Sequence, residues 1–247
     1  MSLSLSARAV TTAVVAGLVG IAAWLGVVPL VLVGLVAVCL LAGGWPAIAG
    51  QPMNGGTPVV LGATGIVALI AAWRTATDPI MRFVAVGIAM ALAMSFLAEM
   101  LRKDGRPGLV NSLAASITGA IIATGMAGWV AAVRSATGAA LVITGALALV
   151  FASAVVALPI HPGWLAAAIT VWVAAGVGLL AGFFVPHAGW DIGVIAGATA
   201  GAAVAAFRVL LSDEHRYKQT IPGIAAAIVP VAATGILMYA LKWLLLG

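Results

Sequence analysis

The sequence predicts an all-α fold: a polytopic bundle of about nine transmembrane helices that forms one integral membrane domain, residues 1–247. Hydrophobic residues make up 64% of the chain and charged residues only 7%, with a mean hydropathy of +1.26, whereas soluble domains are about half apolar and a quarter charged. The apolar runs approach the roughly 20 residues that a helix needs to cross hydrocarbon. They are continuous rather than alternating, which favours helices over a barrel.

The first apolar block, residues 9–42, is too long for one upright helix at about 1.5 Å per residue. Gly26 and Pro29 offer a break near its middle, so we expect a hairpin of two helices; one span here would lower the total to eight. The expected helices cover residues 9–25, 27–42, 57–73, 80–101, 109–133, 139–158, 164–184, 191–211 and 222–246.

Three features of the first quarter refine this prediction. Residues 1–25 resemble a signal peptide, but further spans follow, which favours an uncleaved first helix. Cys39 lies within an apolar run and is expected to be a small buried hydrophobe. Residues 43–56 are uncharged and rich in glycine and proline, so they are expected to form a loop, with Trp45 at the membrane interface. Pro58 then suits the first turn of the third helix.

Small residues recur every four positions in two of the later helices, which is typical of faces where another helix approaches closely. In the fifth helix these residues are Ser112, Ser116, Ala120, Thr124 and Gly128. In the eighth helix they are Gly193, Gly197, Gly201 and Ala205. Helix packing is the favoured interpretation, and a permeation path lined by glycine is the alternative.

Two charged turns, residues 99–107 and 212–218, are separated by four predicted spans and therefore lie on the same side of the membrane. Arg8, near the N-terminus, is predicted on this side too. The excess of Lys and Arg here predicts that this side and the N-terminus are cytoplasmic, in a cell membrane such as a bacterial inner membrane. Their charged side chains form a predicted face for anionic lipid or a partner protein. This face comprises Glu99, Arg102, Lys103, Asp104, Arg106, Asp213, Glu214, His215, Arg216 and Lys218.

The sequence offers little catalytic chemistry. All six acids lie in or near predicted loops, which weakens an ion-coupled transporter, since such proteins keep a carboxylate near the midplane. His187 and Asp191 make an incomplete metal site, and His161 is predicted on the opposite side. No nucleophile elbow, Walker loop, dinucleotide fingerprint or zincin motif occurs. The chain therefore predicts no cofactor or metal, and its basic residues sit at segment ends, which argues against nucleic acid.

The second half of the chain carries a family resemblance. A small-residue helix (197–208) leads into the charged turn 212–218, then Pro222-Gly223, then a last apolar helix. This order, together with the small-residue pattern of the fifth helix, resembles the phosphatidate cytidylyltransferases, the CDP-diacylglycerol synthases. In that family a His-Gly-Gly and Asp-Arg-hydrophobe-Asp signature follows the Pro-Gly pair, whereas here Ile-Ala-Ala-Ala-Ile-Val-Pro follows. The resemblance therefore implies a degenerate relative without the metal-binding carboxylates of cytidylyl transfer.

These observations favour a non-catalytic multi-pass membrane protein that binds anionic lipid or another membrane protein through the charged face. A small-solute or lipid permease is the first alternative, and it predicts a continuous polar cavity that reaches the midplane. An enzyme that acts on a lipid phosphate is the second alternative. It needs the carboxylates of the two charged turns close enough to share a cation.

Overall fold

The computed structural model describes residues 5–51, 56–75, 82–102, 108–158, 160, 162–211 and 219–246, without the side chains of residues 5, 82–84, 86 and 246. Nine α-helices make up this described part. They are α1 (Leu5–Leu25), α2 (Val27–Ile48), α3 (Thr57–Arg74), α4 (Arg82–Leu101), α5 (Leu109–Ala132), α6 (Ala136–Val156), α7 (Gly163–Phe184), α8 (Trp190–Leu210) and α9 (Thr220–Leu246).

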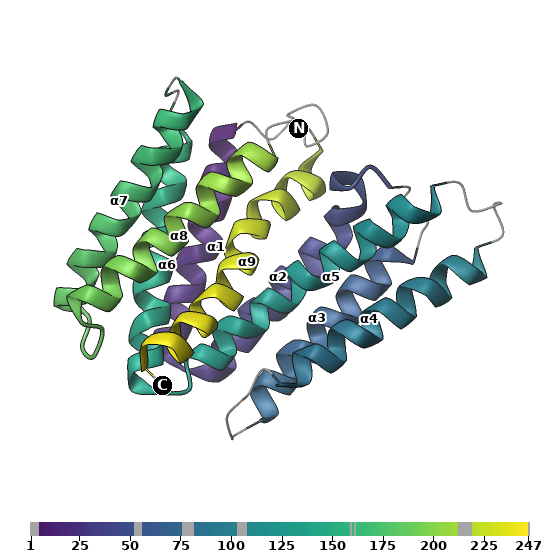
Figure 1. Cartoon of the computed structure of the whole chain (residues 1–247), viewed down its shortest axis with the longest axis horizontal. Coiled ribbons are helices and arrows are strands. Elements are labelled where there is room, and N and C mark those ends of the chain that lie inside the picture. Colours follow the sequence, from purple (N-terminus) through teal and green to yellow (C-terminus); the bar gives the residue numbers. More distant parts are fainter. Residues whose placement is uncertain are drawn as a thin grey trace.

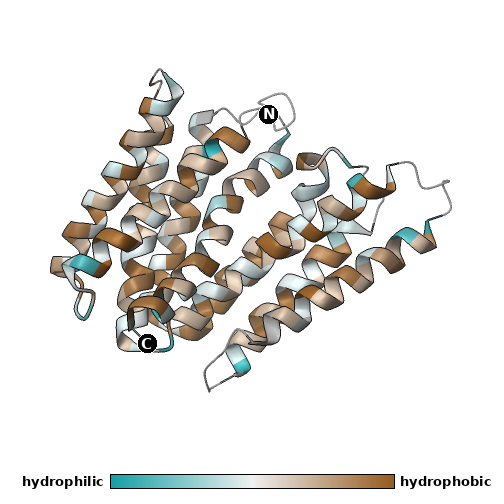
Figure 2. Ribbon diagram, in the orientation of Figure 1, coloured by the Kyte–Doolittle hydropathy of each residue, from teal (hydrophilic) through white to brown (hydrophobic). Residues whose placement is uncertain are grey.

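Eight of these nine helices are long and apolar enough to cross a membrane, by length and composition. The exception is α4, whose described apolar stretch is the shorter Gly87–Leu101. Hydrophilic residues gather near the helix ends, whereas the helices themselves are mostly hydrophobic (Figure 2). The predicted all-α, polytopic fold is therefore confirmed.

Consecutive helices run in opposite directions, so the two ends of the bundle are distinct (Figure 1). We call the end that holds Leu5 the N-side and the end that holds the last turn of α9 the C-side. Helices α4 and α8 finish on the N-side, and α5 and α9 begin there. The segments 103–107 and 212–218, which fall outside the described residues, thus connect helices at the same end of the bundle.

The two N-terminal helices form the predicted hairpin, since Gly26 interrupts the apolar block. Its φ of 122° is a conformation that side chains with a Cβ rarely adopt, and no added Cβ would find a neighbour within 4 Å there. Cys39 corrects one expectation, because its side chain is exposed on α2 rather than buried.

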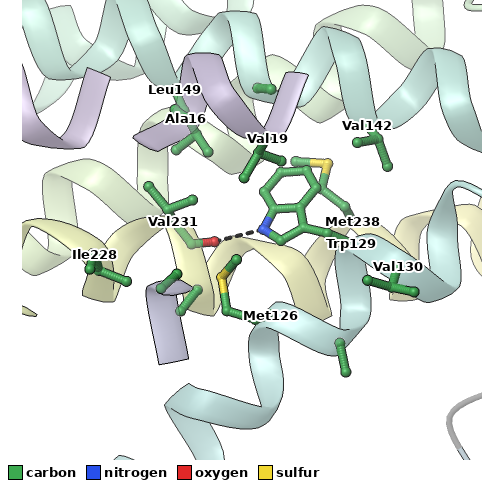
Figure 3. Packing of buried hydrophobic residues seen from close by; sticks show 14 of the residues in the cluster. Ala16, Val19, Met126, Trp129, Val130, Val142, Leu149, Ile228, Val231 and Met238 are labelled. Atoms are coloured by element: carbon green, nitrogen blue, oxygen red, sulfur yellow. Dashed lines mark hydrogen bonds between the residues drawn. The ribbon is translucent and has the colours of Figure 1, made fainter. Parts of the chain in front are cut away.

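The bundle centre is filled by large apolar side chains around Trp129 of α5 (Figure 3). The indole is fully buried, and its Nε1 donates a hydrogen bond of 2.9 Å to the carbonyl oxygen of Val231 in α9. Val19, Leu149 and Met238 surround it, which brings α1, α6 and α9 to the same point. Helix α9 contacts α1, α2, α5, α6 and α8 and is therefore the central helix of the bundle.

The segment expected to begin a loop at Gly43 is instead helical as far as Ile48, so that prediction was wrong. Gly44 lies against α9, where an added Cβ would come within 2.7 Å of the Ile221 carbonyl oxygen. Trp45 is buried rather than interfacial, and its Nε1 donates to the Ala115 carbonyl oxygen at 2.8 Å. Here glycine permits close helix approach, and the packing of α2 against α5 and α9 overrides the local turn signal.

Candidate functional site

The structure describes two members of the predicted charged face, Glu99 and Arg102, both at the N-side end of α4. The other members lie outside the described residues: Lys103, Asp104, Arg106, Asp213, Glu214, His215, Arg216 and Lys218. The separation of the carboxylates in the two charged turns, on which the enzyme alternative depends, therefore also lies outside the described part of the chain.

Glu99 is a buried acid whose two carboxylate oxygens both accept hydrogen bonds. Only 6% of the residue is exposed, and the Ser112 hydroxyl at the start of α5 donates to Oε1. Arg102, three residues further along the chain, donates from Nη1 to Oε2 at 2.8 Å. A carboxylate bound in this way attaches α4 to α5.

The small-residue positions of α5 face several helices rather than one. Ser112 turns toward Glu99 of α4, and the Ser116 hydroxyl shares a hydrogen bond of 2.8 Å with Thr57 of α3. Thr124 is fully buried and bonds within its own helix, to the Ile121 carbonyl oxygen. A Cβ added at Gly128 would overlap the carbonyl group of Gly235 in α9. The expected packing face is thus divided along its length between α4, α3 and α9.

The glycines of α8 lie against α7 at backbone distance. An added Cβ at Gly193 or Gly197 would overlap a carbonyl oxygen of α7, from Gly178 and Ala174 respectively. Gly201 approaches the same helix, where an added Cβ would lie 2.7 Å from the Ala174 Cβ. These glycines therefore line a helix contact, which leaves no space for a permeation path between the two helices.

A second polar cluster, absent from the predicted face, lines a pocket between α1, α6, α8 and α9. We call it the arginine pocket, because Arg8 of α1 and Arg208 of α8 both line it, together with Thr12, Ser153 and mostly alanine and valine. Its volume is about 60 Å³, enough for roughly four water molecules. The lining residues, all within the described part of the chain, include no acid and no histidine.

The donors of the arginine pocket are fixed to different degrees. Arg8 is 8% exposed and places Nη1 3.4 Å from the Leu211 carbonyl oxygen. Thr12 donates to the Ala227 carbonyl oxygen at 2.9 Å, which joins α1 to α9 beneath the two arginines. The Nη1 atom of Arg208 is buried and has no hydrogen-bond partner in the described part of the chain. A buried guanidinium nitrogen in that state can donate to a ligand.

The described C-side cations, in contrast, contact the protein itself. Arg134 donates from Nη2 to the Ala72 carbonyl oxygen at 2.9 Å and also to that of Trp73, which caps the end of α3. Arg74 stacks over the Trp73 ring, with 4.9 Å between Cζ and the ring centroid. His187 and Asp191 flank the start of α8, and no metal-binding group of three His, Cys, Asp or Glu occurs among the described residues.

The described pockets do not form a polar path through the bundle. The centre around Trp129 is packed, and a groove of about 340 Å³ between α1 and α6 is lined by apolar residues such as Ala16, Trp24 and Val150. This packed centre argues against the permease alternative, which requires a continuous polar cavity to the midplane.

Sequence reasoning placed Arg8 at the same end as the two charged turns but did not predict that Arg8 and Arg208 line one pocket. One signal was available, since both arginines lie inside predicted or observed apolar helices, where a cation is costly and needs a partner or a role. What the sequence did not reveal is that α1 and α8 both pack against α6 and α9.

Comparison with known proteins gives no relative: no protein-family model, curated protein or solved structure matches this chain. Function is therefore inferred from the chemistry of the N-side.

Proposed function

We propose that this multi-pass membrane protein is non-catalytic and binds anionic lipid through the cations of its N-side. The observation that carries the proposal is the uneven distribution of cations between the two ends. Seven of the eleven Lys and Arg residues belong to N-side helix ends or to the two segments that connect them: Arg8, Arg102, Lys103, Arg106, Arg208, Arg216 and Lys218.

The physical basis is attraction between these cations and the negative surface of a membrane leaflet, which contributes about 1 kcal/mol for each Lys or Arg near the surface. Helix ends at the N-side lie at the level of the lipid headgroups if the eight long apolar helices span the hydrocarbon. Described cations contact the protein at both ends. Arg134 and Arg74 lie against α3, and Arg8 and Arg102 donate to Leu211 and Glu99. The two ends therefore differ in the number of their cations.

The non-catalytic part of the proposal rests on Glu99 and on the sequence after Pro222-Gly223. Ser112 and Arg102 each bond one oxygen of Glu99, which supports a structural role for this acid between α4 and α5. The segment that follows Pro222-Gly223 lacks the acidic signature of the phosphatidate cytidylyltransferases. We therefore place the chain, at most, as a relative of that family that keeps lipid binding without cytidylyl transfer.

The test is to neutralise the turn cations and measure the lipid that stays bound. In the rim variant, Arg102, Lys103, Arg106, Arg216 and Lys218 are all replaced by Gln. We expect this protein, purified in a mild glycoside detergent, to retain several-fold less phosphatidylglycerol in native mass spectrometry. A control with Arg74→Gln and Lys242→Gln changes the C-side instead and should retain the wild-type amount. Equal retention by the rim variant and the wild type would reject the proposal.

A further inference from the structure

The arginine pocket suggests a defined binding site below the general cationic surface of the N-side. We infer that Arg8 and Arg208 together bind one phosphate group, carried by a lipid headgroup or present as free phosphate. The inference deepens the proposed function by assigning a ligand class to one site. It does not depend on the turn cations Lys103, Arg106, Arg216 and Lys218, which are absent from the pocket lining.

The charge of the pocket favours an anion. Two guanidinium groups, which stay protonated at any physiological pH, line the same small space, and the other lining residues are neutral. Removing the Arg208 guanidinium from water is costly, and the positive charge of Arg8 on the same lining adds to that cost, so an anion in the pocket would offset it. The buried Nη1 of Arg208, which has no hydrogen-bond partner among the described residues, supplies a donor for that anion.

The geometry of the donors favours phosphate among anions. Each guanidinium presents its N–H groups as a planar fork, which matches a pair of phosphate oxygens. The Arg8 guanidinium lies next to the Leu211 carbonyl oxygen, which limits its motion before any ligand arrives. Arg8 and Arg208 come from different helices, so a bound phosphate would bridge α1 and α8.

The depth of the pocket fits the same ligand. Thr12 and Ala227 each lie seven residues inside their helices and Pro230 lies ten, so the pocket reaches about 10–15 Å inward from the N-side at 1.5 Å per residue. The headgroup region of a bilayer occupies several ångströms on either side of the hydrocarbon. If the N-side helix ends lie at the level of the headgroups, such a pocket would open where lipid phosphates lie.

The experiment compares Arg208→Gln with wild-type protein, both full length and purified in a glycoside detergent that contains no phosphate. Arg208→Gln removes the charge but none of the protein hydrogen bonds described above, so the protein should fold, which its thermal midpoint will check. Arg8→Lys is the second variant, because it keeps the charge and loses the fork. The control is Arg74→Gln, an exposed arginine at the C-side.

The probes are phosphatidylglycerol and diacylglycerol, a lipid without phosphate, followed by native mass spectrometry, with inorganic phosphate as a competitor. Because a hydrogen bond to a charged group contributes about 1.5–3 kcal/mol, we expect Arg208→Gln to weaken phosphatidylglycerol binding about ten- to hundred-fold. Arg8→Lys should weaken it less, and Arg74→Gln should leave it unchanged. Diacylglycerol should bind all variants equally weakly.

The outcomes separate the source of the phosphate and the two proposals. If inorganic phosphate displaces phosphatidylglycerol, the pocket accepts the free ion. If phosphatidylglycerol binding depends on Arg208 but inorganic phosphate does not displace the lipid, the lipid headgroup is the ligand. If the rim variant loses phosphatidylglycerol while Arg208→Gln and Arg8→Lys bind it like the wild type, the lipid function stands and the arginine pocket is overturned as its site. If only Arg208→Gln loses it, the pocket stands and the turn cations are dispensable.

Discussion

The two edges of the bundle attach their outer helices in different ways. At one edge, α7 and α8 meet through glycines whose backbones touch along most of the interface, at Gly178, Gly182, Gly193 and Gly197. At the other edge, α4 contacts α3 and α5 through a narrow buried stripe that ends at Glu99. The difference shows that one chain joins its helices in two ways, by van der Waals contact between backbones and by a few directional hydrogen bonds. Within lipid, the hydrophobic effect does not drive helices together, so these contacts must do so.

The two edges also differ in how much added volume they accept. Every glycine named at the α7–α8 contact would place a Cβ against backbone atoms of the other helix, which cannot move aside. At Gly87, near the start of the described part of α4, an added Cβ meets nothing within 4 Å. Near the opposite end of α4, a Cβ added at Gly56, which precedes α3, would overlap the Ala98 side chain. Helix α4 is therefore held closely at its N-side end and loosely at Gly87.

The largest effect is expected from Gly197→Val in α8, because the new side chain would overlap the Ala174 carbonyl oxygen. Overpacking of this kind costs about 1–3 kcal/mol, and contact with an immovable backbone should bring it to at least about 3 kcal/mol. The thermal midpoint in detergent should fall sharply. Gly176→Val, on the exposed side of α7 with no atom within 4 Å, is the matched control. Equal stability of the two variants would contradict backbone contact at this edge.

An intermediate effect is expected from Ser112→Ala, which removes the hydroxyl bonded to Glu99. Hydrogen bonds between membrane helices are typically worth about 0.6 kcal/mol and up to about 1.7, and an ionised acceptor places this one near the upper limit. The free energy of unfolding in mixed micelles should fall by about 1–2 kcal/mol. Ser95→Ala is the control, because the Ser95 hydroxyl bonds only the Ala91 carbonyl oxygen of its own helix. A loss no larger than that of the control would remove the polar attachment of α4.

The smallest effect on stability is expected from Gly87→Ala, and its sign should be opposite to that of the same substitution at Gly178. Gly87→Ala should raise stability by up to about 1 kcal/mol, since alanine is the better helix former and the site has room. Gly178→Ala should lower stability, because the same methyl group would overlap the Gly193 carbonyl oxygen. Unfolding free energies of the two variants, measured side by side, provide the comparison. Two changes of the same sign would mean that the edges are packed alike.

Much of the fold was predictable from sequence because hydrocarbon imposes simple rules on length and polarity. The expected hairpin at Gly26 is found, and the expected helix 109–133 is observed as Leu109–Ala132. The prediction of a loop from Gly43 failed because glycine occurs both in turns and at close contacts between helices. Gly44 precedes Trp45-Pro46 and has the composition of a turn, yet it lies against α9 inside a continuous helix.

The candidate site was less predictable because it depends on which helices are neighbours. The charged turns and the arginine pocket lie at the same end of the bundle, and the pairing of Glu99 with Arg102 follows from their spacing of three residues. The Ser112 bond to Glu99 joins different helices, and the arginine pocket brings together Arg8 and Arg208, 200 positions apart. Neither arrangement leaves a periodic trace in the sequence.

The central position of α9 has a consequence for biosynthesis. Trp129 and Thr12 donate hydrogen bonds to carbonyl groups of α9, which is synthesised after every helix that it contacts. Earlier helices can enter the bilayer one after another, but the surfaces that pack on α9 have no counterpart until α9 itself is made. A polypeptide halted before Thr220 would leave inserted yet unassembled segments, the kind of intermediate that membrane quality-control proteases remove.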